Sequence, residues 1–350
     1  MYEQGVIRPP SEANSLLLRV TRNCPWNQCL FCPAFKGVKF SKRTVEEVKK
    51  DIDAMAREYN GHTSTIRSLF LQDGDSLILP TADVLDILAY AKEKFPDIGR
   101  ITTYARATTI RKKTPEEMRL LREAGLSRIH MGLESGSPTV LKLMKKGISP
   151  EDITISGRRV VEAGISLSEY IIPGLGGKTL TGEHAHETAR LLNIVRPDFI
   201  RVRSFALHPQ SPINRLIAGG KFVLMNDEET IEELRRLVVA LAEMHSYFSC
   251  GDYGPNLLMD VDGYLDEKKG QMLAVIDGYL SLDKRQKQAY SLLRRTSYVR
   301  CPVSTVQDPA VMEKMLPEIQ RLDQQEGGVD GYIRRIMSQM IPQPQTEDWK

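Results

Sequence analysis

Six short apolar runs, separated by segments with helical patterning, organise the first 205 residues of the chain. The candidate strands cover residues 15–20, 66–72, 100–105, 127–133, 165–172 and 198–205. Helix-start signals lie between them: Thr44 is followed three residues later by Glu47, and Thr114 is followed by Pro115. This alternation predicts parallel strands joined by crossover helices, either as most of a barrel or as an open doubly wound sheet.

The distribution of polar residues along the runs favours the barrel. Side chains alternate between the two faces of a strand, so His130 and Glu134 share one face of their run. Polar sets also share a face in the other runs: Thr102, Tyr104 and Arg106; Ser166, Ser168 and Tyr170; Arg201 and Arg203. A closed, packed barrel is filled by branched apolar side chains. We therefore predict an α/β fold, an incomplete (βα)6 TIM-type barrel with a polar lumen, the alternative being rim or edge residues with local hydrogen bonds.

The domain organisation follows from a change of pattern near residue 206. We predict an N-terminal arm over 1–13, the partial barrel over 14–205, and a helical C-terminal extension over 206–350. Expected helices of the extension cover 226–248, 267–280, 283–295, 309–322 and 331–340, and residues 341–350 resemble a poorly ordered terminus.

Composition excludes several classes of protein. The net charge is only +3 over 350 residues, so nucleic acid is not an expected partner. No apolar run reaches the 18 residues of a membrane-spanning helix, and we expect a cytoplasmic protein without a membrane partner. Five cysteines, three of them clustered, do not resemble a secreted disulfide framework and favour metal or redox chemistry.

The cysteine cluster, Cys24-x4-Cys29-x2-Cys32, directly follows the first apolar run. Three thiolates within nine residues can converge on one metal centre, and on a four-iron cube they would leave one iron open. Two alternatives remain at this point. One is an iron–sulfur electron carrier or sensor with Cys250 or Cys301 as fourth ligand, since the spacing also matches plant-type ferredoxins. The other is a structural zinc site of three cysteines and a histidine.

Residues 14–205 resemble the radical S-adenosylmethionine (SAM) superfamily. The resemblance rests on the cysteine loop, on Asp73-Gly74-Asp75 after the second run, on residues 132–137 after the fourth, and on residues 164–174. It is nearest to the branch of oxygen-independent coproporphyrinogen oxidases and elongator-type enzymes. Two departures stand out: the family's usual loop is Cys-x3-Cys-x2-Cys, and its usual Gly-Gly-Glu is here Asp73-Gly74-Asp75.

The resemblance implies a single [4Fe–4S] cluster on Cys24, Cys29 and Cys32, with SAM bound at the fourth iron. A one-electron donor such as flavodoxin or ferredoxin would drive reductive cleavage of SAM. The resulting 5′-deoxyadenosyl radical would take hydrogen from a substrate that the sequence does not identify.

The resemblance also implies site residues at the strand ends. A backbone carbonyl of the 73–75 motif would meet the SAM ammonium, Lys146 its carboxylate, and aromatic or apolar residues its adenine. The expected SAM contacts are Phe31, Asp73, Gly74, Asp75, Tyr104, Arg106, Glu134, Lys146, Ile165 and Pro173. His130 is a candidate for proton transfer or substrate binding, and Arg201 and Arg203 for an anionic substrate group. Each role has a structural alternative. The 73–75 motif could be a plain turn, and Phe31, Ile165 and Pro173 could be core packing. His130 could be a buried histidine with satisfied hydrogen bonds, and Arg201 and Arg203 could form a structural ion pair.

Overall fold

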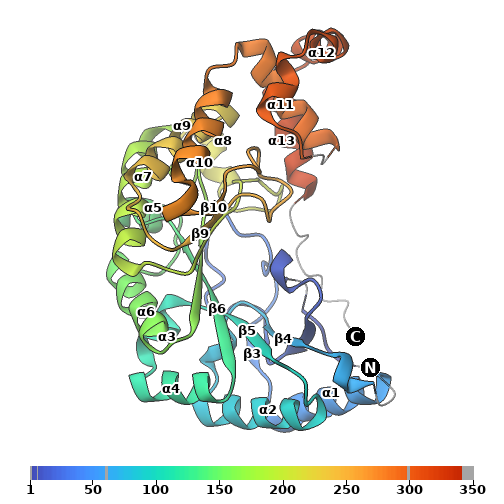
Figure 1. Cartoon of the computed structure of the whole chain (residues 1–350), viewed down its shortest axis with the longest axis vertical. Helices are drawn as coiled ribbons and strands as arrows, with labels where there is room; N and C mark the ends of the chain where they lie inside the picture. The colour runs from blue at the N-terminus through green and yellow to red at the C-terminus, as the bar shows by residue number, and fades with distance from the viewer. Residues whose placement is uncertain (1, 6, 60–61, 298–299, 341–350) are drawn as a thin grey trace. The chain divides into compact units, whose positions relative to one another are not determined.

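The computed structural model describes residues 2–5, 7–59, 62–297 and 300–340 (Figure 1). The described chain forms two compact units: unit 1 comprises residues 2–133 and 146–169, and unit 2 comprises residues 134–145 and 170–340. Each unit is described by itself. Among the described helices, none combines the length and the apolar character that crossing a bilayer requires.

Unit 1 is built on parallel strands ordered β1-β4-β5-β6, followed by the first residues of β7. Leu16 pairs with Leu69, Ser68 with Arg100, and Tyr104 with His130. The strands are β1 (Leu16–Arg19), β4 (Ser68–Gln72), β5 (Arg100–Ala105), β6 (Leu126–Glu134) and β7 (Ser166–Ile171), with a short antiparallel pair β2 (Thr21–Arg22) and β3 (Ser41–Lys42). The five corresponding predicted strands are confirmed, whereas the β2–β3 pair was not predicted.

The helices of unit 1 begin at the capping signals that the sequence carries. Thr44 and Glu47 exchange side-chain hydrogen bonds with each other's backbone N–H at 3.2 and 2.8 Å, and Thr114 does the same with Glu117. The α1 helix packs on α2 and α2 on α4, as Figure 1 shows. The helices are α1 (Val45–Glu58), α2 (Thr81–Lys94), α3 (Ala107–Lys112), α4 (Pro115–Glu123) and α6 (Pro150–Glu162), with 3-10 turns at Pro10–Glu12, Thr63–Thr65 and Ser76–Ile78.

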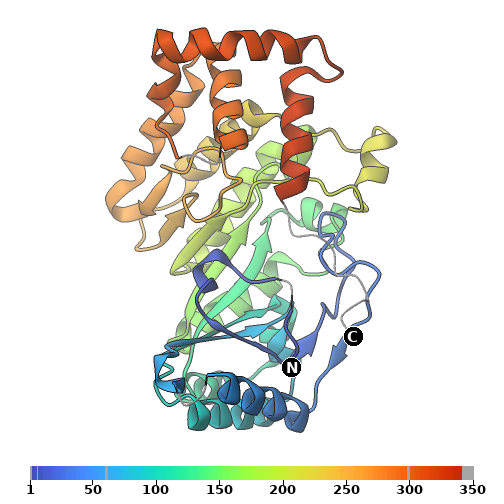
Figure 2. The ribbon, with the colours of Figure 1, turned by 90° about the vertical axis from the view of Figure 1, so that its right-hand side faces the viewer.

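Unit 2 continues with β8 (Phe199–Val202), β9 (Tyr247–Ser249) and β10 (Asp262–Tyr264). The β9 strand pairs in parallel with β8 and antiparallel with β10. The helices α11, α12 and α13, coloured orange to red in Figure 2, pack on one another. The helices of unit 2 are α5 (Pro138–Leu143), α7 (Gly177–Val195), α8 (Asn214–Ala218), α9 (Asp227–Ala240), α10 (Leu265–Leu280), α11 (Lys284–Ser297), α12 (Pro309–Asp323) and α13 (Gly328–Met340), with a 3-10 turn at Val303–Gln307.

The α/β class and the helical C-terminal part are confirmed, and one predicted helix is wrong at its end. The helix expected over 226–248 begins after its cap Asn226 but ends at Ala240, and residues 247–249 form β9 instead. Phe248 is fully buried in this strand, because aromatic residues pack well on a pleated surface. The remaining helices of the extension lie where the sequence predicts them. The predicted terminus 341–350 lies outside the described residues.

Candidate functional site

The cysteine loop lies between β2 and β3 of unit 1. Cys24, Cys29 and Cys32 are free thiols and partly exposed. Burial, together with the charges of Cys29 and Cys24, raises the pKa of the Cys32 thiol to about 11, although a hydrogen bond with the Ala34 backbone and the charge of Lys146 oppose the rise. The three sulfurs therefore lie close enough to interact electrostatically. Thiolates are the ligands that iron–sulfur clusters prefer.

The start of the loop is fixed by the second motif. The buried carboxylate of Asp73 accepts hydrogen bonds from the backbone N–H of Asn23 at 2.9 Å and from Nε of Arg19 at 2.8 Å. Gly74 packs directly on Cys24, since a Cβ at this position would lie 3.0 Å from Cβ of Cys24. Glycine thus permits the loop and the end of β4 to approach one another closely.

The other acid of the motif fixes a second loop. Asp75 is fully buried and accepts hydrogen bonds from the backbone N–H of Arg106 at 3.3 Å and from Oγ1 of Thr109 at 2.5 Å. Burial raises the pKa of Asp75 to about 6, although these hydrogen bonds oppose the rise. Both acidic side chains of the motif therefore contact protein groups, Asp73 at the cysteine loop and Asp75 at the start of α3.

Cationic and aromatic side chains cover the cysteine loop. The guanidinium of Arg106 lies 5.1 Å from the ring centroid of Trp26 and donates to the carbonyls of Lys146 at 3.2 Å and Gly147 at 3.3 Å. Nζ of Lys146 lies 5.7 Å from the ring centroid of Phe31. The structure thus brings three predicted SAM contacts, Phe31, Arg106 and Lys146, together at the loop. Gly147 belongs to the same group of residues but was not predicted from the sequence. Its φ is +69°, and a Cβ at this position would overlap Trp26.

A cavity of about 250 Å³ lies beside the loop at the carboxyl ends of β4 and β5. Its lining includes Pro25 of the loop, Asp75 and Arg106. Active sites of TIM-type barrels lie at the carboxyl ends of the strands. The cavity, the cysteine loop and the 73–75 motif all lie at this edge of the unit 1 sheet.

His130 and Tyr104 belong to a buried group in the same unit. Their rings lie 5.8 Å apart, and Nε2 of His130 lies 3.4 Å from Oε1 of Glu12. Glu12 is fully buried, and its Oε1 forms an ion pair with Nη1 of Arg100 at 2.7 Å. Burial raises the pKa of Glu12, but hydrogen bonds from His130 and Ser15 and the charge of Arg100 outweigh it and lower that pKa to about 2. These contacts are those of a structural network, and a proton-transfer role for His130 stays a prediction.

The remaining predicted residues are divided between the units. Ile165 of unit 1 is buried just before β7. In unit 2, Glu134 has a φ of +61° and its carbonyl accepts from the N–H of Ile172 at 3.2 Å. Pro173 follows β7 and lines a cavity of unit 2.

Arg201 and Arg203 meet a common acid. Asp252 pairs with Nη1 of Arg201 and, at 2.9 Å, with Nη1 of Arg203. The guanidinium of Arg203 also lies 4.6 Å from the ring centroid of Tyr170 and 4.8 Å from that of Tyr253. The structure therefore places both arginines in an ion-pair and cation–π network. Their role toward an anionic substrate stays a prediction.

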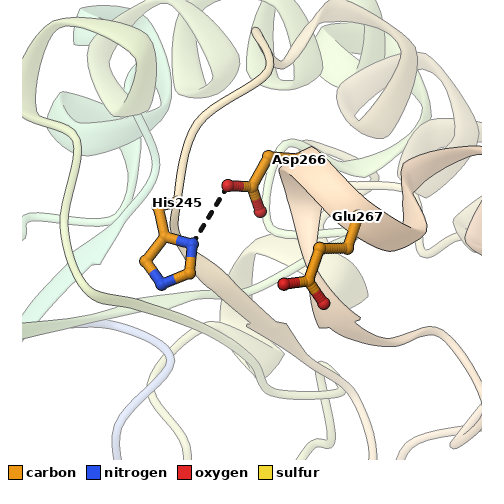
Figure 3. Close-up of side chains that lie close together, drawn as sticks. All are labelled: His245, Asp266 and Glu267. Carbon is orange, nitrogen blue, oxygen red and sulfur yellow. Dashed lines mark hydrogen bonds and ion pairs between the residues drawn. The ribbon is translucent and has the colours of Figure 1, made fainter.

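One group of potential metal ligands lies on the surface of unit 2. Within the described chain, His245, Asp266 and Glu267 bring one ligand atom each to within 4.8 Å of one another (Figure 3). Nδ1 of His245 pairs with Oδ2 of Asp266 at 3.0 Å, and its ring stacks on Tyr264 at 4.3 Å. All three ligand residues are exposed. This arrangement is a solvated ion pair, and no cysteine takes part in it.

Comparison with known proteins identifies the class. The sequence model of the radical SAM superfamily matches residues 18–192, the half of the chain that carries the cysteine loop, the 73–75 motif and strands β4 to β7. The chain belongs to this superfamily and is a radical SAM enzyme. The cofactors of the class, a [4Fe–4S] cluster and SAM, suit the three-thiol loop with its close glycine and cationic cover.

Two curated relatives show the breadth of the similarity. An uncharacterized methyltransferase of Pyrococcus horikoshii is 28% identical over 219 residues, which are 60% of this chain and 44% of the relative. A tRNA-2-methylthio-N(6)-dimethylallyladenosine synthase of Chlorobium phaeobacteroides is 29% identical over 214 residues, which are 59% of this chain and 45% of the relative. The chain spans less than half of the length of either relative.

A solved structure shows the fold. The cobalamin-dependent SAM radical enzyme OxsB, solved with aqua-cobalamin and SAM bound, aligns with a TM-score of 0.52 and 17% identity, over 93% of this chain and 58% of that one. The predicted fold class, an incomplete TIM-type barrel with a helical C-terminal extension, is confirmed.

Proposed function

We propose that this enzyme cleaves SAM reductively and uses the product radical to take hydrogen from a substrate. With a cluster on Cys24, Cys29 and Cys32, one electron from an external donor breaks the S–C5′ bond of SAM and yields methionine and a 5′-deoxyadenosyl radical. Transfer of a hydrogen atom from a substrate C–H bond then gives 5′-deoxyadenosine and a substrate radical. The observation that carries the proposal is the cysteine loop packed on Gly74 and fixed by Asp73.

The residues of this chain bind and orient SAM in the proposal. The backbone of the 73–75 motif takes the SAM ammonium, because both acidic side chains of the motif already have protein partners. Lys146 pairs with the SAM carboxylate beside Phe31, where the structure places its ammonium. Arg106 stays oriented toward the loop by its stacking on Trp26.

The other predicted SAM contacts take the roles that the family resemblance implies. Tyr104 and Glu134 reach the ribose, and Ile165 and Pro173 flank the adenine. His130 transfers a proton or binds the substrate, and Arg201 and Arg203 hold an anionic group of the substrate. The low polarity of Trp26 and Phe31 beside the cysteines supports control of the cluster potential, because solvent exposure and hydrogen bonds to the sulfurs set the potential of such sites.

The electron donor in the proposal is a flavodoxin or a ferredoxin, and the location is the cytoplasm, where a reducing environment keeps the thiols free. The curated relatives include a methyltransferase and a methylthiotransferase. These names support group transfer as a further outcome of the substrate radical. The substrate itself is not part of the proposal.

The test begins with anaerobic reconstitution with iron and sulfide. The expected protein is brown, absorbs near 400 nm, holds about four irons per chain, and forms 5′-deoxyadenosine from SAM with dithionite. Cys29→Ser is expected to lose cluster and product. Cys250→Ser and Cys301→Ser are matched controls that keep both, whereas a ferredoxin-type site would lose its cluster with one of them. A colourless zinc protein, or a cluster protein that leaves SAM intact, refutes the proposal.

A methyl label in SAM distinguishes hydrogen abstraction from group transfer. In a reaction with methyl-labelled SAM, hydrogen abstraction alone leaves the label in methionine. Methyl or methylthio transfer moves it into a product. The same experiment therefore decides whether the group-transfer chemistry named for the relatives extends to this chain.

A further inference from the structure

Unit 2 contains a cavity of about 80 Å³ where strands β7 and β8 end. Pro173 and Gly174 follow β7, and residues 204–207 follow β8. The apolar part of its lining is formed by Phe205, Leu207, Leu224, Ile333 and Met337, and the charged part by Asp227, Arg295, Asp330 and Arg334. A water needs about 10–15 Å³ by the same measure, so the cavity admits a small organic group.

Two charged residues of this lining, Arg295 and Asp227, have buried polar atoms that form no hydrogen bond in the described chain. Arg295 of α11 is 3% exposed, and its Nη2 donates to Oδ1 of Asp227 at 2.9 Å. Within the described chain, Nε and Nη1 of Arg295 and Oδ2 of Asp227 are buried and have no hydrogen-bond partner. Buried donors and acceptors in native proteins are almost always paired. Two donors and one acceptor at the cavity wall therefore indicate a missing ligand.

The preceding residue of the same helix shows what a purely structural arginine looks like here. Arg294 is also buried, but it donates to the carbonyls of Leu257 at 3.1 Å, Asn256 at 3.0 Å and Gly254 at 3.4 Å. Arg294 thus ties α11 to the loop before β10. Arg295, which lines the cavity, retains donors for something else.

We propose that this cavity binds a zwitterionic α-amino acid with an apolar side chain. A free N–H of Arg295 donates a hydrogen bond to the carboxylate, and the free oxygen of Asp227 accepts a hydrogen bond from the ammonium. The two acids and two arginines of the lining, Asp227, Asp330, Arg295 and Arg334, are neutral in sum, so a ligand that carries both charges leaves the site neutral. The apolar side chain packs against the apolar residues of the lining. Binding is measured without cluster or SAM, so a failure of this proposal is distinguishable from a failure of the proposed catalysis, although Pro173 of the lining is also assigned to the adenine.

Binding is measured on the full chain by isothermal titration with three probes of equal chain length. The probes are L-norleucine, hexanoate, which lacks the ammonium, and n-hexylamine, which lacks the carboxylate. L-Norleucine is expected to bind at least tenfold more tightly than either of the others. Undetectable binding of L-norleucine, or equal binding of hexanoate or n-hexylamine, overturns the proposal.

Variants locate the site. Arg295→Gln and Asp227→Asn are expected to weaken L-norleucine binding at least tenfold, while Arg285→Gln, an exposed arginine of the same helix that pairs with Asp323, leaves it unchanged. Leu207→Trp keeps the charged pair and fills the cavity from a partly exposed position, so it is expected to abolish binding even where loss of Arg295 impairs folding. Wild-type affinity in folded Arg295→Gln or in Leu207→Trp overturns the proposal.

Discussion

Replacement of Glu12 by glutamine removes a charge that three elements of unit 1 share. The carboxylate is fully buried, with Arg100 at 2.7 Å, Ser15 at 2.7 Å and His130 at 3.4 Å. These partners outweigh burial and lower the pKa of Glu12 from 4.5 to about 2. One pKa unit corresponds to about 1.4 kcal/mol, so Glu12→Gln is expected to lower the free energy of unfolding by roughly 3 kcal/mol at pH 7.

The contribution of Glu12 to the free energy of unfolding depends on pH. Because the pKa of Glu12 is lower in the folded state, its contribution is complete above pH 4.5 and is lost as the pH falls toward 2. The difference between wild type and variant should thus shrink to about 1.4 kcal/mol at pH 3. Urea unfolding followed by circular dichroism at pH 7, 5 and 3 measures it. Glu123→Gln, an exposed carboxylate, is the control and should change stability by less than about 0.5 kcal/mol. A difference that does not vary with pH would refute the reasoning.

Three further predictions follow from the site. Gly147→Ala should destabilise unit 1 by about 2–4 kcal/mol, because alanine is strained at this left-handed position and its Cβ would overlap Trp26, and the variant should also bind less iron. The control Gly278→Ala, at an open helix position, should be neutral or stabilising. Equal melting temperatures of the two variants would contradict this. Burial raises the pKa of Asp75 to about 6, so its contribution to stability falls as the pH rises from 3.8 to about 6, and urea midpoints should show Asp75→Asn gaining on wild type over that range; a constant gap argues against it. Asp252→Asn removes the carboxylate that pairs with Arg201 and Arg203 and should lower the free energy of unfolding by about 3–5 kcal/mol. Added sulfate, which can pair with the two guanidinium groups, should restore part of this loss.

Much of the fold could be predicted because its signals are local. Strand runs with alternating faces, and caps such as Thr44 with Glu47, act within a few residues, and the strands and caps lie where the sequence places them. The error at the end of α9 has the opposite origin. Residues 247–249 become a strand because β8 and β10 lie on either side of them, and that pairing joins segments far apart in the sequence.

The candidate site divides in the same way. The spacing of Cys24, Cys29 and Cys32 alone indicated a three-thiolate centre, because ligands within one loop need no tertiary structure to converge. Sequence patterns could not assign Asp73 and Asp75 to the loops that they hold, since their partners lie 50 and 31 to 34 residues away.

By itself, then, the sequence determined the class of fold and the superfamily, and it predicted the three-thiolate centre, because all of these depend on short-range spacing and periodicity. Only the tertiary structure decided which buried charges meet. Glu12 reaches Arg100 across 88 residues, and Arg295 reaches Asp227 across 68. Such pairs are selected by the low-dielectric interior in which the chain brings them together, where an unpaired charge is costly, and no local pattern records that choice.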